Sequence, residues 1–266
     1  MEPLLSVPRL SFGASAPAPG ARNLPAEVAV ALSFNGTTQA VMMATPADLI
    51  DFAYGFSLTE GIASPGDVDS INIVETPLGI DLQIWLRDDA EARLAGRRRT
   101  MTGPVGCGLC GIDSLTEAMR APRPLPPGNF HLTSVQVMAA IASLPAAQPL
   151  HDATRAVHAA GFWAGGLHNV REDVGRHNAL DKLIGHLCRQ APVAGAVLLT
   201  SRVSIDMVQK VCALGAPVLI AVSAPTAQAV AMADAAGLTL IACARTDRFE
   251  VFTHPQRLIP ESANVA

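Results

Sequence analysis

The C-terminal half of the chain alternates between short apolar runs and segments with helical periodicity. Residues 195–200, 217–222 and 238–242 are apolar runs of strand length, and residues 204–214 and 225–236 carry apolar positions at helical spacing. This β-α-β-α-β order predicts parallel strands joined by right-handed crossovers.

The segments that precede this run predict a hairpin and two helices. Residues 157–163 and 167–171 flank Gly165-Gly166 and are expected to pair as a hairpin. Residues 135–143 and 177–188 have helical patterns.

The N-terminal half begins with a predicted β-hairpin. Residues 27–34 and 37–44 alternate between apolar and polar positions, and Asn35-Gly36 between them favours a type I′ turn. A helix should then begin at Thr45-Pro46, with Thr as N-cap and Pro in the first turn, and end near Thr59. Two more strands are expected over residues 71–76 and 80–86.

The predicted fold class is α/β: a mixed, largely parallel sheet with helices on both faces, plus a smaller α+β N-terminal domain. Residues 1–24 are rich in Pro, Ala and Gly and are expected to form a flexible tail. The N-terminal domain should cover residues 25–120. Prolines mark a linker at 121–130, and the C-terminal α/β domain should cover 131–266.

Composition excludes some functions. Half of the 266 residues are hydrophobic and the net charge is −4, which argues against a protein that coats nucleic acid. The longest apolar run, residues 211–222, is interrupted by Gly215 and Pro217 and is shorter than the ~20 residues of a spanning helix. No signal peptide is recognisable at the N-terminus. We therefore expect a cytoplasmic protein with no nucleic-acid or membrane partner.

The strongest local motif is a pair of cysteines in a glycine-rich loop. The motif reads Cys107-Gly108-Leu109-Cys110, with further glycines at 103, 106 and 111. Such a pair can bind metal, form a disulfide or carry sulfur. Zinc normally needs four ligands, and a thioredoxin-type motif opens a helix directly after a strand, so a sulfur carrier fits better. The remaining cysteines, Cys188, Cys212 and Cys243, are expected to be small buried apolar residues.

Polar residues follow each of the three predicted parallel strands. Because the carboxyl ends of parallel strands form a common ligand-binding edge, these residues predict an anion or nucleotide pocket, although Ser and Thr at such positions also serve as ordinary helix caps. They are Ser201, Arg202, Ser223, Ala244, Arg245, Thr246, Asp247, Arg248 and Phe249.

The polar segment 171–182 has two interpretations. It could be the charged start of a helix with i,i+4 pairs such as His177 with Asp181, or it could be the wall of a site.

Several motifs together resemble the formate dehydrogenase accessory sulfurtransferases, the FdhD proteins. The resemblance extends from about Pro25 to Pro260 and is specific because the motifs occur in the right order. The motifs lie at residues 41–46, 55–61, 106–111, 172–182, 201–202 with 207–210, 221–226 and 253–258.

The resemblance implies a sulfur transfer reaction. Members take sulfur from a cysteine desulfurase and pass it to a molybdenum or tungsten bis(pterin guanine dinucleotide) cofactor, which the catalytic subunit of formate dehydrogenase requires. The persulfide cysteine falls on Cys107, with Cys110 as the supporting thiol, and the cofactor-binding stretch falls on residues 244–249. A guanine nucleotide (GDP) would mimic part of that cofactor. A cytidine-deaminase-like larger domain and a homodimer are also implied.

Two other functions remain as alternatives. A non-catalytic chaperone of the molybdenum cofactor would need no thiol. A zinc-dependent nucleotide deaminase would need a third ligand and a general-acid Glu, and no His-x-Glu precedes the cysteine pair. In the sulfur carrier, nucleotide phosphates are expected near Arg202, Arg245 and Arg248, with no metal bound by the protein itself.

Overall fold

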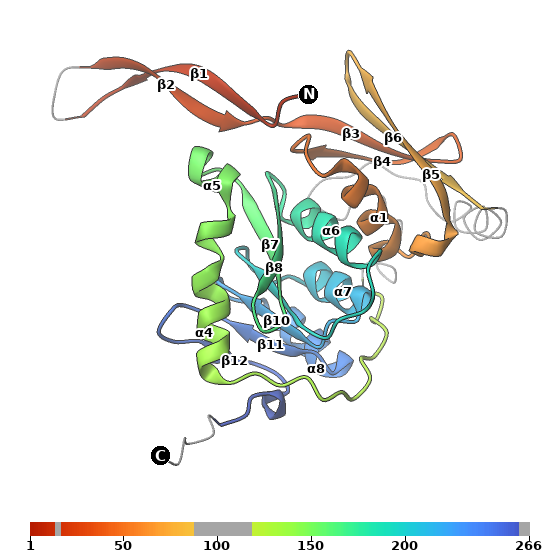
Figure 1. The fold of residues 1–266 in the computed structure, drawn as a ribbon, viewed down its shortest axis with the longest axis vertical. Helices are drawn as coiled ribbons and strands as arrows, with labels where there is room; N and C mark the ends of the chain where they lie inside the picture. Colours follow the sequence, from red (N-terminus) through yellow and green to blue (C-terminus); the bar gives the residue numbers. More distant parts are fainter. Residues whose placement is uncertain (14–16, 88–118, 261–266) are drawn as a thin grey trace.

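The computed structural model describes residues 1–13, 17–87 and 119–260. Figure 1 shows a central sheet with helices on both faces and a second, smaller sheet on the far side of helix α1. The central sheet has the strand order β12-β11-β10-β9-β7-β8. Its strands are β7 (His158–Trp163), β8 (Leu167–Asp173), β9 (Ala196–Leu199), β10 (Val218–Ala221), β11 (Thr239–Ala242) and β12 (Glu250–Val251).

The central sheet is mixed, as predicted, but the prediction that it is largely parallel is wrong. Only β9–β10 and β10–β11 are parallel neighbours, whereas β7–β8, β7–β9 and β11–β12 are antiparallel. The β-α-β-α-β run is therefore confirmed, and it is flanked by antiparallel strands. The hairpin β7–β8 needs no crossover helix, so it can join the sheet in the opposite direction.

Helices cover both faces of this sheet. One face packs against α6 (Arg176–Leu187), α7 (Ile205–Leu214) and α8 (Ala227–Ala236), whose apolar side chains form one core cluster with the strands. The other face packs against α4 (Ser134–Ser143), which is followed by η2 (Pro145–Ala147) and the short α5 (Pro149–Thr154). Helices α4, α6, α7 and α8 match the predicted segments closely, whereas η2 and α5 were not predicted.

The smaller sheet has the order β4-β3-β6-β5. Asn35 and Gly36 have φ values of 46° and 76°, so the predicted turn between β3 and β4 is confirmed. The sheet packs one face against α1. Its elements are β3 (Val28–Phe34), β4 (Thr37–Ala44), α1 (Leu49–Thr59), η1 (Pro65–Asp67), β5 (Val68–Thr76) and β6 (Gly79–Leu86).

Helix α1 begins at Leu49 and not at Thr45-Pro46, because Thr45 has another role. Thr45 is buried; its amide donates to the carboxylate of Asp173, and its hydroxyl accepts a bond from the amide of Val174. The side chain that was expected to cap α1 thus joins the two halves of the molecule.

Helices α1 and α6 pack with almost no space between their backbones. A Cβ atom at Gly55 would overlap the carbonyl oxygen of Asp181, and one at Gly185 would overlap that of Asp51. These glycines permit a close crossing, which fixes α6 and the strand β8 before it against the N-terminal half.

Residues 1–24 do not form the tail without regular structure that the composition predicted. They contain β1 (Leu4–Ser11) and most of β2 (Ala18–Pro25), which pair as an antiparallel ribbon that extends away from the body (Figure 1). Most of its side chains are exposed. Backbone pairing, unlike core packing, needs no apolar periodicity, so the ribbon was missed.

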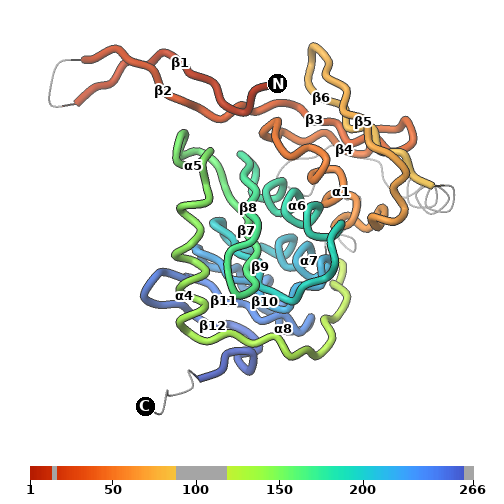
Figure 2. Tube along the Cα trace, viewed as in Figure 1, coloured from red at the N-terminus to blue at the C-terminus, as the bar shows by residue number. Residues whose placement is uncertain are grey.

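The proline-marked segment 121–130 runs alongside the C-terminal half (Figure 2). The amide of Leu125 donates to the carbonyl of Ala236 at the end of α8, and Leu125 and Phe130 pack against the cores. A 3-10 turn, η3 (Pro255–Arg257), closes the described chain. The domain boundaries proposed from the sequence remain a prediction.

Candidate functional site

The cysteine pair, Cys107 and Cys110, lies outside the described residues. The described chain stops at Arg87 after β6 and resumes at Met119. On the resuming side, Arg120 donates to the carbonyl of Thr59 at the end of α1 and accepts a bond from Gln209 of α7.

The carboxyl ends of β9, β10 and β11 meet at one edge of the central sheet. The amide of Val222 bonds to Leu199 at 2.9 Å, and that of Ala244 bonds to Ala221 at 3.1 Å. The amide of Cys243 also reaches the carbonyl of Ser223 at 3.3 Å. The three groups of candidate residues therefore lie together, as the parallel order of the strands predicted.

The side chains at this edge differ in what they offer a ligand. Ser201 is buried and its hydroxyl donates to the carbonyl of Arg202, whereas Arg202 is exposed. Ser223 is half-buried. Polar residues thus follow the carboxyl ends of both β9 and β10.

Several polar side chains in the segment that follows β11 form hydrogen bonds or ion pairs within the protein. Arg245 Nη1 donates to the carbonyls of Val222 and Ala244, at 2.6 and 2.8 Å. Arg248 and Asp247 are exposed and lie 3.6 Å apart, and Thr246 is also exposed. Ala244 and Phe249 pack into the core. Of the two arginines in this segment, Arg248 is the more available to a ligand, because Arg245 is bonded to two backbone carbonyls.

Two helix N-termini point at the same edge without a side-chain cap. The N-cap of α6 is Gly175, which has no side chain, and the side chain of Ser204 does not cap α7. The hydroxyl of Thr226, in contrast, caps α8 by accepting a bond from the amide of Ala229. Helix N-termini carry partial positive charge and unsatisfied N–H groups. The start of α6 and that of α7 are therefore suited to an anion.

His177 and Asp206 form an ion pair that joins the first turns of these two helices. Burial would raise the pKa of Asp206, but the hydrogen bond and the charge of His177 lower it to about 2. The sequence singled out His177 but gave it the wrong partner, Asp181, because only the tertiary structure brings α7 beside α6.

Arg176 and His158 lie next to this pair, and the neighbouring charges favour the neutral form of His158. His158 opens β7 opposite Asp173; burial lowers its pKa, as do the charges of Arg176, His151 and His177. The Nε atom of Arg176 is buried and has no hydrogen-bond partner among the described residues. The sequence gave no signal for His158 beyond its residue type, whereas Arg176 lies in the polar segment that it had marked.

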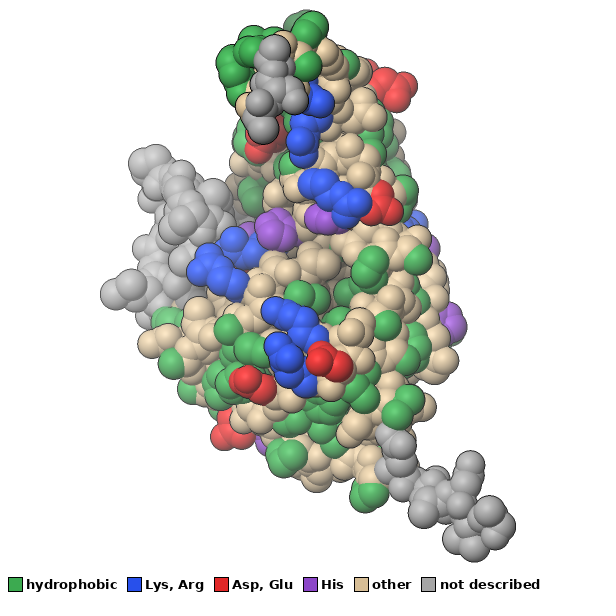
Figure 3. Space-filling model, turned by 90° about the vertical axis from the view of Figure 1, so that its left-hand side faces the viewer, with side chains coloured by type: hydrophobic (Ala, Val, Ile, Leu, Met, Phe, Trp, Pro, Cys, Tyr) green, Lys and Arg blue, Asp and Glu red, His purple; other side chains and the backbone are tan. Residues whose placement is uncertain are grey.

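A hollow lies on the face of the molecule that carries these strand ends. Figure 3 shows this face, with Lys or Arg and His side chains around the hollow and few acidic ones. The segment between β11 and β12 projects on the same side in Figure 1. The face is suited to an anionic ligand.

Much of the polar segment 171–182 is structural. Lys182 is fully buried and donates to Asp173 at 2.6 Å and to the carbonyl of Thr45 at 2.8 Å, and Asn178 donates to the carbonyl of Met43. These bonds tie α6 to the end of β4.

A second buried pair ties α6 and α7 to the end of α1. Lys210 Nζ contacts both carboxylate oxygens of Asp181, at 2.9 and 3.0 Å, and Thr59 donates to Asp181 at 2.7 Å. Burial alone would lower the pKa of Lys210, but Asp181 and Glu60 raise it, so Lys210 is charged.

Two of the three described cysteines, Cys188 and Cys212, are unsuited as sulfur acceptors. Burial raises the pKa of Cys188 to about 11 and that of Cys212 to about 12, which suppresses the reactive thiolate. Cys188 and Cys243 are only half-buried, contrary to the prediction, whereas Cys212 is buried as predicted. Cys243 also has a positive φ of 52° at the end of β11. Among the described residues, no three His, Cys, Asp or Glu side chains are grouped to hold a metal.

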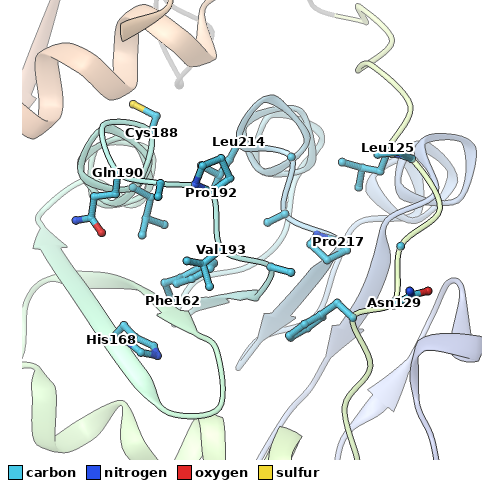
Figure 4. Close-up of a pocket in the computed structure, with 18 of the residues that line it drawn as sticks. Leu125, Asn129, Phe162, His168, Cys188, Gln190, Pro192, Val193, Leu214 and Pro217 are labelled. Carbon is cyan, nitrogen blue, oxygen red and sulfur yellow. The ribbon is translucent and has the colours of Figure 1, made fainter.

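A cavity of about 550 Å³ lies at the opposite edge of the sheet, near the first residues of β9 and β10. Figure 4 shows apolar side chains on its walls, among them Phe162, Val193, Leu214 and Pro217. The C-terminal ends of α6 and α7 line this cavity, and they repel anions because the C-terminus of a helix carries partial negative charge. The anion-binding surface and this cavity are therefore different places.

Uncapped helix N-termini beside the carboxyl ends of parallel strands are typical of an α/β protein that binds a nucleotide or another anion. The chain matches the FdhD/NarQ family over residues 25–259 and belongs to it. It is 51% identical to the sulfur carrier protein FdhD of Agrobacterium fabrum, over 95% of each chain, and 52% identical to that of Brucella abortus biovar 1, over 90% of each.

A solved structure has the same fold. It is a crystal structure described as a candidate formate dehydrogenase accessory protein from Desulfotalea psychrophila, with a TM-score of 0.77 and 25% identity, and the match covers 96% of this chain and 99% of that one. Within the described residues, no helix combines the length and apolar character that crossing a bilayer would take.

Proposed function

We propose that this protein is a cytoplasmic sulfurtransferase. It accepts sulfur from a cysteine desulfurase as a persulfide on Cys107 and passes it to a molybdenum or tungsten bis(pterin guanine dinucleotide) cofactor bound for formate dehydrogenase. The proposal is carried by the identity of about half of all residues to sulfur carrier proteins over 95% of their length. The same alignment length argues that the whole activity, and not one module of it, is present.

The first step is an exchange between two sulfur atoms. The Cys107 thiolate attacks the terminal sulfur of the donor persulfide; a new S–S bond forms on Cys107, the donor's S–S bond breaks, and the donor cysteine leaves as a thiolate. No electrons are gained or lost overall. Cys188 and Cys212 are poor competitors because burial raises the pKa of each thiol.

The second step releases the sulfur to the acceptor. The Cys110 thiolate attacks the Cys107 sulfur, a Cys107–Cys110 disulfide forms, and the outer sulfur leaves with both electrons of the broken bond as sulfide, which becomes a ligand of the cofactor metal. A thiol reductant then restores the pair. Full sulfuration by a Cys110→Ser variant would contradict this step.

The acceptor cofactor is a substrate, and its nucleotide is proposed to bind at the carboxyl ends of β9, β10 and β11. The starts of α6 and α7, which have no side-chain cap among the described residues, fit a phosphate-bearing ligand. Residues 244–249 contribute the segment after β11. A homodimer and contact with the catalytic subunit of formate dehydrogenase belong to the same proposal.

Mass spectrometry tests the carrier role directly. The protein is incubated with an active desulfurase and cysteine, and added sulfur is mapped in the wild type, in Cys107→Ala and, as a matched control, in Cys212→Ala. We expect sulfur on Cys107 in the wild type and the control, and none in Cys107→Ala. Sulfur on neither member of the pair would instead favour the non-catalytic chaperone, and stoichiometric zinc would favour the deaminase.

A further inference from the structure

The ribbon of β1 and β2 projects from the body, which covers little of it. Figure 2 shows the two strands leaving the body side by side. Arg22, in the middle of β2, donates to the carbonyl of Thr154 in α5, whereas Leu10 and Phe12, nearer to the tip, are 54% and 76% exposed. A two-stranded hairpin on its own is at best marginally stable in water. The ribbon would therefore gain stability from a further surface that covers it.

The ribbon lies outside the part of the chain that defines the family. The family model matches residues 25–259, and all of the ribbon except Pro25 precedes that range. The sulfur transfer that the family shares therefore does not account for the ribbon, and its exposed apolar side chains call for a role of their own.

Prolines oppose growth of the ribbon by strand pairing. Strand β1 contains Pro8, and β2 contains Pro19 and Pro25, and the antiparallel register runs without a break between the two strands. Proline has no N–H, so in a regular ladder its nitrogen must point to the outer edge, where it leaves no donor. Both outer edges are therefore poor templates for a further strand, and the two faces of the ribbon remain as contact surfaces.

The two faces of the ribbon differ in charge. Residues that pair directly across the strands lie on the same face. One face carries Arg9 and Arg22, and the bond of Arg22 to Thr154 turns this face toward α5. The opposite face carries no charged residue, and we call it the uncharged face. Its central pairs are Ser6 with Asn23, Pro8 with Ala21 and Leu10 with Pro19.

A second copy of the chain fits the uncharged face best. A contact with twofold symmetry brings the same patch of two copies together, so each charge in the patch meets a like charge. The face with Arg9 and Arg22 would repel its own copy, whereas the uncharged face would not. A different protein is commonly selected through complementary charge, which the uncharged face does not offer.

We propose that two copies of the chain pack the uncharged faces of their ribbons against each other, antiparallel and about a twofold axis. At about 3.4 Å per residue and about 10 Å of width, eight residues of each strand give a face of roughly 270 Å². Because a stable interface takes about 800 Å² from each partner, the expected affinity of this contact is micromolar. The proposal rests on the proposed function for the homodimer alone.

Sedimentation velocity of the full chain over a concentration series from about 1 to about 100 μM tests the contact. Leu10→Asp places two like charges across the twofold axis and should raise the dissociation constant of the dimer about tenfold or more. Leu5→Asp is the matched control, because Leu5 lies on the same strand, is 53% exposed and belongs to the face with the arginines. This variant should associate like the wild type.

Cross-linking provides a second test that does not depend on the stability of the Leu10 variant. Ala21 lies near the middle of the uncharged face, so it should meet its own copy close to the axis. Ala21→Cys should form a disulfide between two copies on mild oxidation with diamide, seen by mass spectrometry as the peptide around residue 21 joined to itself. Gly20→Cys, on the opposite face, should not.

The inference is overturned if Leu10→Asp associates as tightly as the wild type, if the wild type stays monomeric throughout the series, or if the two cysteine variants cross-link equally. These outcomes are separable from that of the sulfur transfer. Sulfur on Cys107 in a protein whose association is insensitive to Leu10→Asp would remove only this inference. Association that depends on Leu10, without sulfur on Cys107, would remove only the carrier role.

Discussion

Gly55 of α1 lies against the backbone of Asp181 in α6, so closely that a Cβ atom at residue 55 would overlap the carbonyl oxygen of Asp181. Both residues are buried, and the carboxylate of Asp181 binds Thr59 one turn further along α1. The helix crossing and the buried ion pair of Asp181 with Lys210 therefore depend on the same close approach.

Replacing this glycine should destabilise the protein strongly. Gly55→Ala must push α1 away from α6, because backbone and not a flexible side chain occupies the space; we expect a loss of about 3 kcal/mol in the free energy of unfolding. Urea denaturation measures it. Gly66→Ala is the matched control, since nothing lies within 4 Å of a Cβ atom there. Equal midpoints for the two variants would show that the helices can separate at little cost.

Removing the buried lysine should be costly as well. Lys182→Met leaves the carboxylate of Asp173 buried without its cation, and breaking such a pair costs about 3–5 kcal/mol. The double variant Asp173→Asn/Lys182→Met should lose less than the two single losses combined, because no charge remains uncompensated. Strictly additive losses in urea denaturation would mean that the two groups do not interact energetically.

The ion pair of His177 with Asp206 predicts a specific pH dependence. The pKa of Asp206 is lowered to about 2 in the folded protein, against about 3.9 for an ordinary Asp, so its ionisation stabilises the fold above about pH 4 and less as the pH falls towards 2. His177→Asn removes this contribution. The difference in stability between the wild type and this variant should be largest near pH 5 and should shrink towards pH 2.

Unfolding titrations at a series of pH values between 5 and 2 measure that difference. The exposed His168 provides the control, since its ring bonds only to the carbonyl of Ala164 among the described residues. His168→Asn should leave the pH dependence of the wild type intact. A difference between wild type and His177→Asn that stays constant from pH 5 to pH 2 would show that the pair does not set the pKa of Asp206.

The half-buried thiol of Cys188 and the buried thiol of Cys212 should resist alkylation. With a pKa of about 11 for Cys188 and about 12 for Cys212, less than about one thiol in a hundred is ionised at pH 8. Both should react with iodoacetamide at least about 100-fold more slowly in the folded protein than in urea. Peptide mass spectrometry follows each site separately, and rapid labelling of Cys212 in the native state would indicate local opening of α7.

Local sequence patterns determined most of the helices and strands and the location of the candidate site. The Asn35-Gly36 turn and the apolar runs at β9, β10 and β11 depend on interactions between near neighbours, which the order of residues alone specifies. The gathering of Ser201, Ser223 and Ala244 at one edge follows from parallel strands. The roles of Cys107, Cys110 and residues 244–249 came from the resemblance and stay predictions.

Only the tertiary structure decided which polar groups are partners. Thr45 bonds to Asp173, and His177 pairs with Asp206 instead of Asp181, because packing brings together residues that lie far apart in the chain. The antiparallel pairing of β7 with β9 and the ribbon β1–β2 were likewise not predictable from local patterns, although the hairpin β7–β8 was. A residue type determines which bonds a side chain can form, whereas packing determines which partner is within reach. Lys182 is therefore paired with Asp173 in the interior, whereas the buried Nε of Arg176 has no acceptor among the described residues.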